Sequence, residues 1–329
     1  MGTIRVGILM KHRLTEVPPG APANRLKALY NQQLNSWPLL KKGVIELGSI
    51  KRRTIDLDGE QLLIQFNPAR MASVAAKVDQ ATIKARPCFL CAENLPPEQG
   101  GIILGQDTVA LANPMPIFDE HFTLTHRDHC RQDITDKTGE FLTVSKELGA
   151  NYAVFFNGAR AGASAPDHHH LQSCPIDSFP LTKGPLKTQM VRELPDLKIE
   201  TVIFCKNRYL LLTSTNKTTL EKRFTEALSI FSKIHPDGAD LINVLSLYEE
   251  GTWQILIMLR EKHRSSHFFA EEPNKLMISP ATVEMSGVIV TARESDFEKI
   301  SPADIRAIYD EVTLNTLAFN EVLNAIQNL

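Results

Sequence analysis

The chain lacks long apolar runs, an excess of charge of either sign, and a large set of cysteines. Among its 329 residues, no apolar run approaches the roughly 18 to 20 residues that a membrane-spanning helix needs. The formal net charge of −2 gives no general electrostatic reason to bind nucleic acid. The sequence also has no Walker-type loop and no dinucleotide-binding glycine fingerprint. We therefore expect neither a membrane protein nor a nucleic-acid-binding protein.

The cysteines are few and odd in number, which argues against a disulfide framework. The five are Cys88, Cys91, Cys130, Cys174 and Cys205. A reducing compartment suits them better, so we expect a cytoplasmic protein. Hydrophobic residues make up 43% of the chain and charged residues 22%, which is enough for a substantial core and argues against disorder.

The length suggests two domains of ordinary size. A stretch rich in proline and lysine, residues 178–187, is the best boundary. We therefore predict an N-terminal half over residues 1–182, which begins with an arm up to about residue 24, and a C-terminal half over residues 183–329. Both halves show the same order of strand, helix and strand pair. This order predicts an α+β fold of two similar halves, each an antiparallel sheet with packed helices.

Hydrophobic spacing predicts individual elements within these halves. Apolar residues at helical intervals predict helices over residues 24–47, 133–149 and 301–326. Alternating runs on either side of Asp58–Gly59 and of Glu250–Gly251 predict two hairpins.

The most informative segment, residues 156–172, joins a loop of small residues to three consecutive histidines. The loop offers glycines for close approach to a ligand, amide and hydroxyl donors, and one cation: Asn157, Gly158, Arg160, Gly162 and Ser164. In an extended segment His168, His170 and Gln172 share one face. A neutral histidine is a competent nucleophile at phosphorus. The segment favours transfer through a phosphoramidate, and the alternative is a metal-binding surface tract.

Residues 168–172, His-His-His-Leu-Gln, resemble the His-x-His-x-Gln motif of the transferase branch of the histidine-triad superfamily. That branch includes galactose-1-phosphate uridylyltransferase, diadenosine tetraphosphate phosphorylase and GDP-galactose phosphorylase. The resemblance implies that His170 is the nucleophile and that His168 is part of the same catalytic motif. It also implies that Gln172 stabilises the nucleotidyl intermediate, in place of the third histidine of the hydrolytic branch, and that both halves are histidine-triad-like.

A second segment supports the same resemblance. Residues 113–116, Asn-Pro-Met-Pro, followed by residues 121–129, are similar to the superfamily's strand that ends in a basic pair and a histidine. In the superfamily the Asn-Pro region lies near the nucleoside, which makes Asn113 a candidate for substrate binding. The resemblance covers residues 86–173 well and the second half weakly.

Cys88 and Cys91 form a C-x-x-C pair that can hold zinc, although the same spacing also occurs in redox motifs and in simple packing. The resemblance supplies two further ligands, which map onto His129 and His168. A structural zinc site of Cys88, Cys91, His129 and His168 follows from it. The main alternatives are His126 in place of His129, and Cys130 as a substitute ligand.

Five further cationic or titratable residues are weaker candidates for substrate binding. Arg70 follows a predicted strand and can meet a substrate phosphate. The predicted second-half hairpin ends in a run that can bind the phosphate of a second substrate: Arg260, Lys262, His263 and Arg264. For both groups the alternative is a solvated charged surface.

These residues together predict a nucleotidyltransferase or phosphorylase that acts through a nucleotidyl-His170. The donor is a nucleoside diphosphate sugar or a dinucleoside polyphosphate, and the acceptor is phosphate or a sugar phosphate. The alternatives are a hydrolase of nucleotide conjugates and a non-catalytic nucleotide sensor on the same fold. A monomer or a homodimer is expected.

Overall fold

The computed structural model describes residues 13–74 and 80–328. The first part of the predicted arm, residues 1–12, lies outside the described residues. The rest of the arm pairs with the edge of the main sheet, where the backbone N–H of Thr15 donates to Gly101 O at 2.8 Å. No helix among the described residues is long and apolar enough to cross a membrane.

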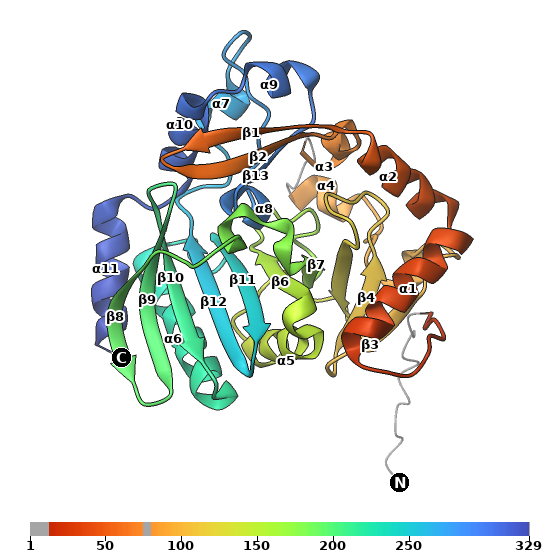
Figure 1. Cartoon of the computed structure of the whole chain (residues 1–329), viewed down its shortest axis with the longest axis horizontal. Coiled ribbons are helices and arrows are strands. Elements are labelled where there is room, and N and C mark those ends of the chain that lie inside the picture. The colour runs from red at the N-terminus through yellow and green to blue at the C-terminus, as the bar shows by residue number, and fades with distance from the viewer. Residues whose placement is uncertain (1–12, 75–79, 329) are drawn as a thin grey trace.

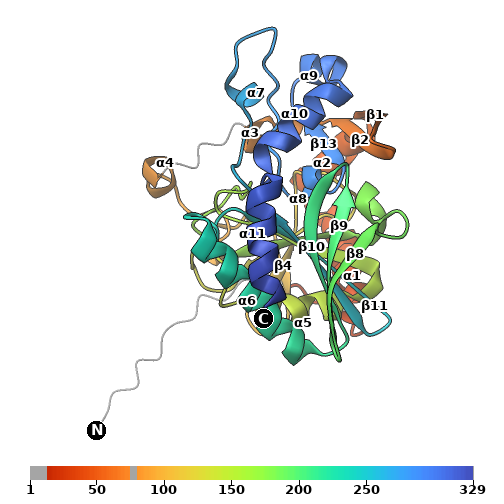
Figure 2. The ribbon, with the colours of Figure 1, turned by 90° about the vertical axis from the view of Figure 1, so that its left-hand side faces the viewer.

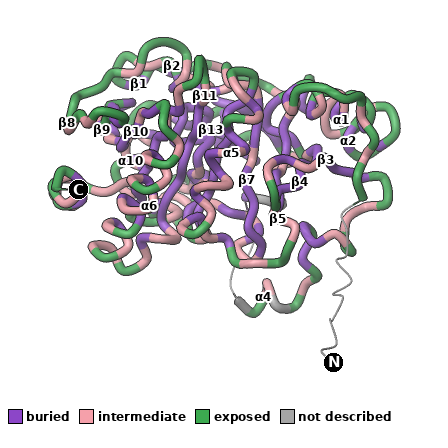
Figure 3. Tube along the Cα trace, turned by 90° about the horizontal axis from the view of Figure 1, so that it is seen from below, coloured by how far each residue is buried: buried purple, intermediate pink, exposed green. Residues whose placement is uncertain are grey.

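A single antiparallel sheet of ten strands runs through the molecule (Figure 1). In spatial order its strands are β3 (Gly101–Leu104), β4 (Thr108–Ala112), β5 (Phe122–His126), β7 (His170–Pro175), β6 (Tyr152–Asn157), β11 (Ile242–Glu249), β12 (Thr252–Leu259), β10 (Asn207–Ser214), β9 (Leu197–Phe204) and β8 (Thr188–Leu194). The strands in the middle of this sheet are buried, whereas the loops at its rim are exposed (Figure 3).

The two halves of this sheet have the same strand order. The order β3-β4-β5-β7-β6 in the first half is matched by β8-β9-β10-β12-β11 in the second. Each half also places one long helix, α5 (Thr138–Leu148) or α6 (Lys217–Ile234), between its third and fourth strands. The halves meet where β6 pairs antiparallel with β11, with Asn157 opposite Asn243. The α+β fold with two similar halves is therefore confirmed, while the boundary at residue 182 stays a prediction.

The halves differ in the connection between their last two strands. In the first half a long loop, residues 158–169, joins β6 to β7, whereas a tight turn at Glu250–Gly251 joins β11 to β12. The turn residues have φ values of 49° and 82°, as this kind of hairpin requires. Only the first half therefore has room for an elaborate loop at this position.

Helices cover one face of the sheet, where α1 (Pro22–Ser36) and α11 (Thr316–Gln327) pack beside α5 and α6 (Figure 2). Helix α6 shows why they lie there. The side chain of Asn216 accepts a hydrogen bond from the backbone N–H of Thr219 and caps its start, and its apolar residues recur at helical intervals. Leu220, Phe224 and Phe231 are fully buried as a result.

A cap covers part of the other face. It contains a three-stranded sheet of β1 (Lys51–Leu57), β2 (Glu60–Phe66) and β13 (Val288–Thr291), together with α8 (Thr282–Met285), α9 (Glu294–Lys299) and α10 (Pro302–Val312). The predicted hairpin at Asp58–Gly59 is confirmed as the β1–β2 turn. Because β13 pairs with β2, segments from both predicted halves build this cap.

Two predicted helices are each split into two. The helix expected over residues 24–47 forms α1 and α2 (Pro38–Gly48), because Pro38 disfavours helical geometry at Trp37. The helix expected over residues 301–326 forms α10 and α11, and the side chain of Asn315 caps the second. The remaining helices are α3 (Met71–Val74), α4 (Gln80–Lys84), α7 (Ser266–Phe269), η1 (Pro68–Arg70), η2 (Ala92–Asn94), η3 (Gly149–Asn151), η4 (Ile176–Ser178) and η5 (Pro180–Thr182).

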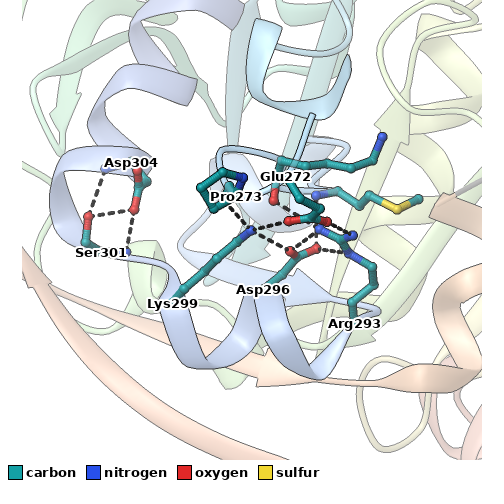
Figure 4. Close-up of polar contacts among 9 residues, drawn as sticks. Glu272, Pro273, Arg293, Asp296, Lys299, Ser301 and Asp304 are labelled. Atoms are coloured by element: carbon teal, nitrogen blue, oxygen red, sulfur yellow. Dashed lines mark hydrogen bonds and ion pairs between the residues drawn. The ribbon is translucent and has the colours of Figure 1, made fainter. Parts of the chain in front are cut away.

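A buried carboxylate anchors the segment that leads into α8. Asp296, on α9, accepts hydrogen bonds from the backbone N–H of Met277 at 3.0 Å and from Arg293 Nε at 2.9 Å (Figure 4). Glu272 in turn pairs with Arg293 and Lys299. These contacts fix the wall that the second half contributes to the cavity described next.

Candidate active site and metal centre

A cavity of about 650 Å³ lies between the cap and the end of the sheet where β6 ends and β7 begins. Residues from both halves line it. Of the candidates named from the sequence, Asn113, Asn157, Gly162, Ser164, His170, Gln172, Arg70 and His263 are on its wall. Three arginines and one carboxylate, Glu284, are the charged groups among the described lining residues, so the cavity suits an anion.

His170 is the first residue of β7, and its imidazole is held in one tautomer. Its Nδ1 lies 2.8 Å from the backbone carbonyl of His168, which can only accept, so Nδ1 carries the proton. Nε2 therefore has a lone pair, and no described residue forms a hydrogen bond with it. Burial lowers the pKa of His170, which keeps the ring neutral and nucleophilic.

Gln132 pins His170 in place. Its Oε1 accepts from the backbone N–H of His170 at 2.7 Å, and its Nε2 donates to the carbonyls of Asn157 and His170 at 2.8 and 2.9 Å. The end of β6 and the start of β7 are thereby held together. No motif in the sequence pointed to Gln132, because its role depends on contacts with distant segments.

Gln172 presents its amide nitrogen to the cavity because a buried histidine holds its oxygen. His121 Nδ1 accepts from the backbone N–H of Ile117 at 3.2 Å, so His121 carries its proton on Nε2. Nε2 then donates to Gln172 Oε1 at 3.0 Å. Burial lowers the pKa of His121 to about 3, so this arrangement persists at physiological pH. The amide N–H groups of Gln172 remain available to a phosphoryl oxygen.

The four predicted metal ligands come together. Their ligand atoms all lie within 4.8 Å of one another. Cys88 Sγ is 3.4 Å from His168 Nδ1, and Cys91 Sγ is 3.2 Å from His129 Nδ1. These separations fit tetrahedral zinc, whose bond lengths place sulfur and nitrogen ligands about 3.5 Å apart.

The histidine tautomer also fits a metal. His168 Nε2 lies 2.9 Å from the carbonyl of His126, so Nε2 carries the proton and Nδ1 turns its lone pair to the thiols. The alternatives do not fit, since His126 Nδ1 instead accepts from the backbone N–H of Asp128 and Cys130 is outside the cluster. His168 therefore belongs to the metal group, and its backbone carbonyl orients His170.

Two family models match the chain. Residues 29–175 match a domain of unknown function, DUF4922, and residues 242–329 match the GDPGP1-like, C-terminal domain. Yeast Ap4A phosphorylase Apa2 in complex with AMP superimposes with a TM-score of 0.59 at 17% identity, over 88% of this chain and 96% of that one. Its complex with Ap4A gives 0.57 at 15% identity, over 88% and 97%. No curated protein matches in sequence.

The chain therefore shares the fold of yeast Ap4A phosphorylase Apa2. The alternation expected for residues 168–172 is seen at three positions. His170 and Gln172 face the cavity, while Leu171 packs into the core beneath the helices. The ring of His169 stacks on Phe156, which belongs to the same core as Leu171.

The glycines of the loop serve packing as much as ligand approach. A Cβ on Gly158 would lie 2.3 Å from the carbonyl oxygen of Asp240, and one on Gly162 would lie 2.5 Å from the Cβ of Ala281. Both contacts are to the second half. Gly158 has no room for a side chain because another strand end packs against it, and its contact with substrate stays a prediction.

Three cationic candidates do not reach the cavity of His170. Arg160 is paired with Asp237, and Lys262 with Glu311 at 2.7 Å. Together with His263, both line a second cavity of about 1010 Å³. Arg260 is fully buried and bonded to protein groups, so its predicted role in substrate binding is wrong.

Arg264, the last cation of the predicted run over residues 260–264, does line the first cavity, whereas Arg86 and Glu284 were missed because neither belongs to a predicted binding motif. Arg264 donates to Ser279 Oγ at 3.0 Å and stacks on Phe268. Glu284 is buried on α8, and burial raises its pKa to about 7, although the charges of Arg70 and Arg260 oppose the rise.

Glu284 predicts how nucleotide affinity changes with pH. As pH rises from 6 to 8 the carboxyl is expected to ionise, so the affinity of this cavity for an anion should fall several-fold. AMP is a suitable probe, although its own phosphate titrates in the same range. Calorimetric titrations of the wild type and of Glu284→Gln should therefore be compared, and the affinity of the wild type should fall more steeply with pH than that of the variant. Parallel profiles would contradict the prediction.

Proposed function

We propose that the chain is a nucleotidyltransferase or phosphorylase that works through a nucleotidyl-His170. The observation that carries the proposal is the neutral His170, with the lone pair of Nε2 turned to a cavity that Gln172 and Asn157 also line. A nucleophile with neighbouring amide donors is what attack at a phosphoryl centre requires.

The first step joins Nε2 of His170 to the α-phosphorus of a nucleoside diphosphate sugar or a dinucleoside polyphosphate. The P–N bond forms as the P–O bond to the leaving phosphate breaks, and that oxygen keeps the electron pair. The His168 carbonyl stabilises the imidazolium through Nδ1–H. In the second step an oxygen of phosphate or of a sugar phosphate forms a new P–O bond and frees His170. Positioning and charge stabilisation should dominate both steps.

The metal group has a structural part in this proposal. Cys88, Cys91, His129 and His168 would hold zinc with four protein ligands, so the ion would have no open position for substrate. Its contribution would be to hold the His168 backbone whose carbonyl orients His170.

Intact-protein mass spectrometry tests the proposal. Purified chain is mixed briefly with nucleoside diphosphate sugars and dinucleoside polyphosphates, and we expect a mass increase of one nucleoside monophosphate. Phosphate or a sugar phosphate should then remove the adduct faster than water does. Discharge by water alone would favour hydrolysis. Tight nucleotide binding without an adduct or turnover for any donor would favour a sensor.

A further inference from the structure

Asn157 ends β6 and lines the cavity, and its side-chain oxygen is turned away from that cavity by the second half of the chain. The oxygen accepts from Asn243 Nδ2 at 2.9 Å and from the backbone N–H of Thr282 at 2.9 Å. The Thr282 hydroxyl lies 2.7 Å away and shares its one proton with the carbonyl of Phe156. Both N–H groups can only donate, so the acceptor must be Oδ1 and the amide nitrogen must occupy the other position.

The orientation of Asn243 is fixed in the same way. Its Oδ1 accepts from Arg260 Nη1 at 2.5 Å, and its Nδ2 also donates to the carbonyl of Ala161 at 2.8 Å. A guanidinium has no acceptor and a carbonyl has no donor, so neither contact survives a flip of the amide. Asn243 must therefore turn its nitrogen toward Asn157.

Arg260 is the fixed end of this chain of hydrogen bonds. It is 0% exposed, and its other donors bond to the backbone carbonyls of Val312, Pro280, Lys262 and His263 at 2.9 to 3.2 Å. Burial lowers its pKa only to about 10, so it stays cationic at neutral pH. Burying a charge costs free energy, and the protein groups around Arg260 take up its donors. We therefore assign Arg260 to orienting Asn243 rather than to binding substrate.

We propose that Arg260 and Asn243 are positioning residues that hold the amide of Asn157 with its N–H groups toward the phosphoryl oxygens of the bound nucleotide. The inference rests on the proposed function. It makes the C-terminal half a part of the active site even though that half lacks the histidine motif. Donors that are already oriented need not rearrange as negative charge develops on the phosphoryl oxygens in the transition state. Such groups contribute most to the rate at that point.

Asn243→Asp tests the proposal because it keeps the oxygen that accepts from Arg260 but replaces the donor to Asn157 with an acceptor. The carboxylate still accepts from Arg260 but offers no N–H, so the Asn157 amide should flip and donate to it. We expect the rate of nucleotidyl-enzyme formation to fall roughly 100-fold, as on loss of an oriented donor. The melting temperature and the Kd for AMP should change little.

A double-mutant cycle separates positioning from the effect of the added charge. Asn157→Ala should be as slow as Asn243→Asp, and the double variant should be no slower than Asn157→Ala alone. Thr282→Val, a second probe that adds no charge, should slow the step about ten-fold, and Thr282→Ser should restore it. Additive losses in the cycle, or a wild-type rate in Asn243→Asp, would overturn the proposal.

Failure of the proposed function gives a different pattern. If the wild type binds AMP but forms no adduct, the orientation of the Asn157 amide can still be followed through its side-chain NMR signals. These signals are assigned by their loss in Asn157→Ala. AMP should shift these signals in the wild type and leave them unshifted in Asn243→Asp. Equal shifts in both proteins would overturn the positioning role independently of turnover.

Discussion

Replacing His170 with alanine is expected to abolish the nucleotidyl-enzyme and to lower turnover by roughly 10⁴-fold or more. The reason is chemical, because the other imidazole on the cavity wall, His263, is hydrogen-bonded through Nε2 to Ser279 Oγ at 2.7 Å. Gln172 and Asn157 are amides and cannot replace it. Nucleotide binding should persist, since the arginines of the cavity and its apolar wall remain.

The measurement is the same mass-spectrometric assay, with rapid quenching to obtain the rate of adduct formation. His267→Ala is the matched control, because it removes a histidine from α7 that does not line the cavity. Melting temperatures of both variants should stay near that of the wild type. An adduct of normal yield in His170→Ala would remove the basis of the proposed mechanism.

Replacing both Cys88 and Cys91 with serine is expected to remove the metal, to lower the melting temperature and to slow adduct formation about 10- to 100-fold. One residue of the cluster, His168, explains both the loss of stability and the loss of rate. Losing the metal frees the ring of His168, while the carbonyl of the same residue sets the tautomer of His170. We expect the melting temperature to fall by about 5 °C or more, since about 1 kcal/mol corresponds to roughly 2–4 °C in chains of 150–250 residues.

Elemental analysis of protein purified without chelators should find close to one zinc per chain in the wild type and none in the double variant. Cys130→Ser is the control, since its thiol is outside the cluster and should leave metal content unchanged. A metal-free wild type with full activity and an unaltered melting temperature would show that the cluster is only packing.

The sequence predicted those parts of the site that lie close together along the chain. Alternation over residues 168–172 placed His170 and Gln172 on one face, and the predicted tight turns are confirmed because their residues determine backbone geometry locally. The break at Pro38 was missed, although a proline inside a helical pattern signals such a break. The ligand set of the metal group came from the family resemblance, and its geometry agrees with that resemblance.

Residues whose role depends on distant partners could not be predicted. The residue type alone suggests that Arg260 is an exposed cation. It is a buried donor only because β11, the segment that leads into α8 and the end of α10 pack around it. Glu284 lies in a segment without a motif and reaches the cavity because Thr282 bonds to Asn157. These contacts join residues that are 17 to 125 positions apart, and hydrophobic periodicity carries no information about them.

The loop over residues 158–169 has no counterpart in the second half, where the turn at Glu250–Gly251 takes its place. The two halves therefore cannot do the same work. Two similar halves provide two equivalent strand ends, but the tight turn cannot hold a nucleophile or wrap a ligand. If His170 carries the nucleotidyl group as we propose, one chain stores only one such group at a time. Departing and incoming substrates would then take turns in the same cavity, and the second half would supply part of its wall.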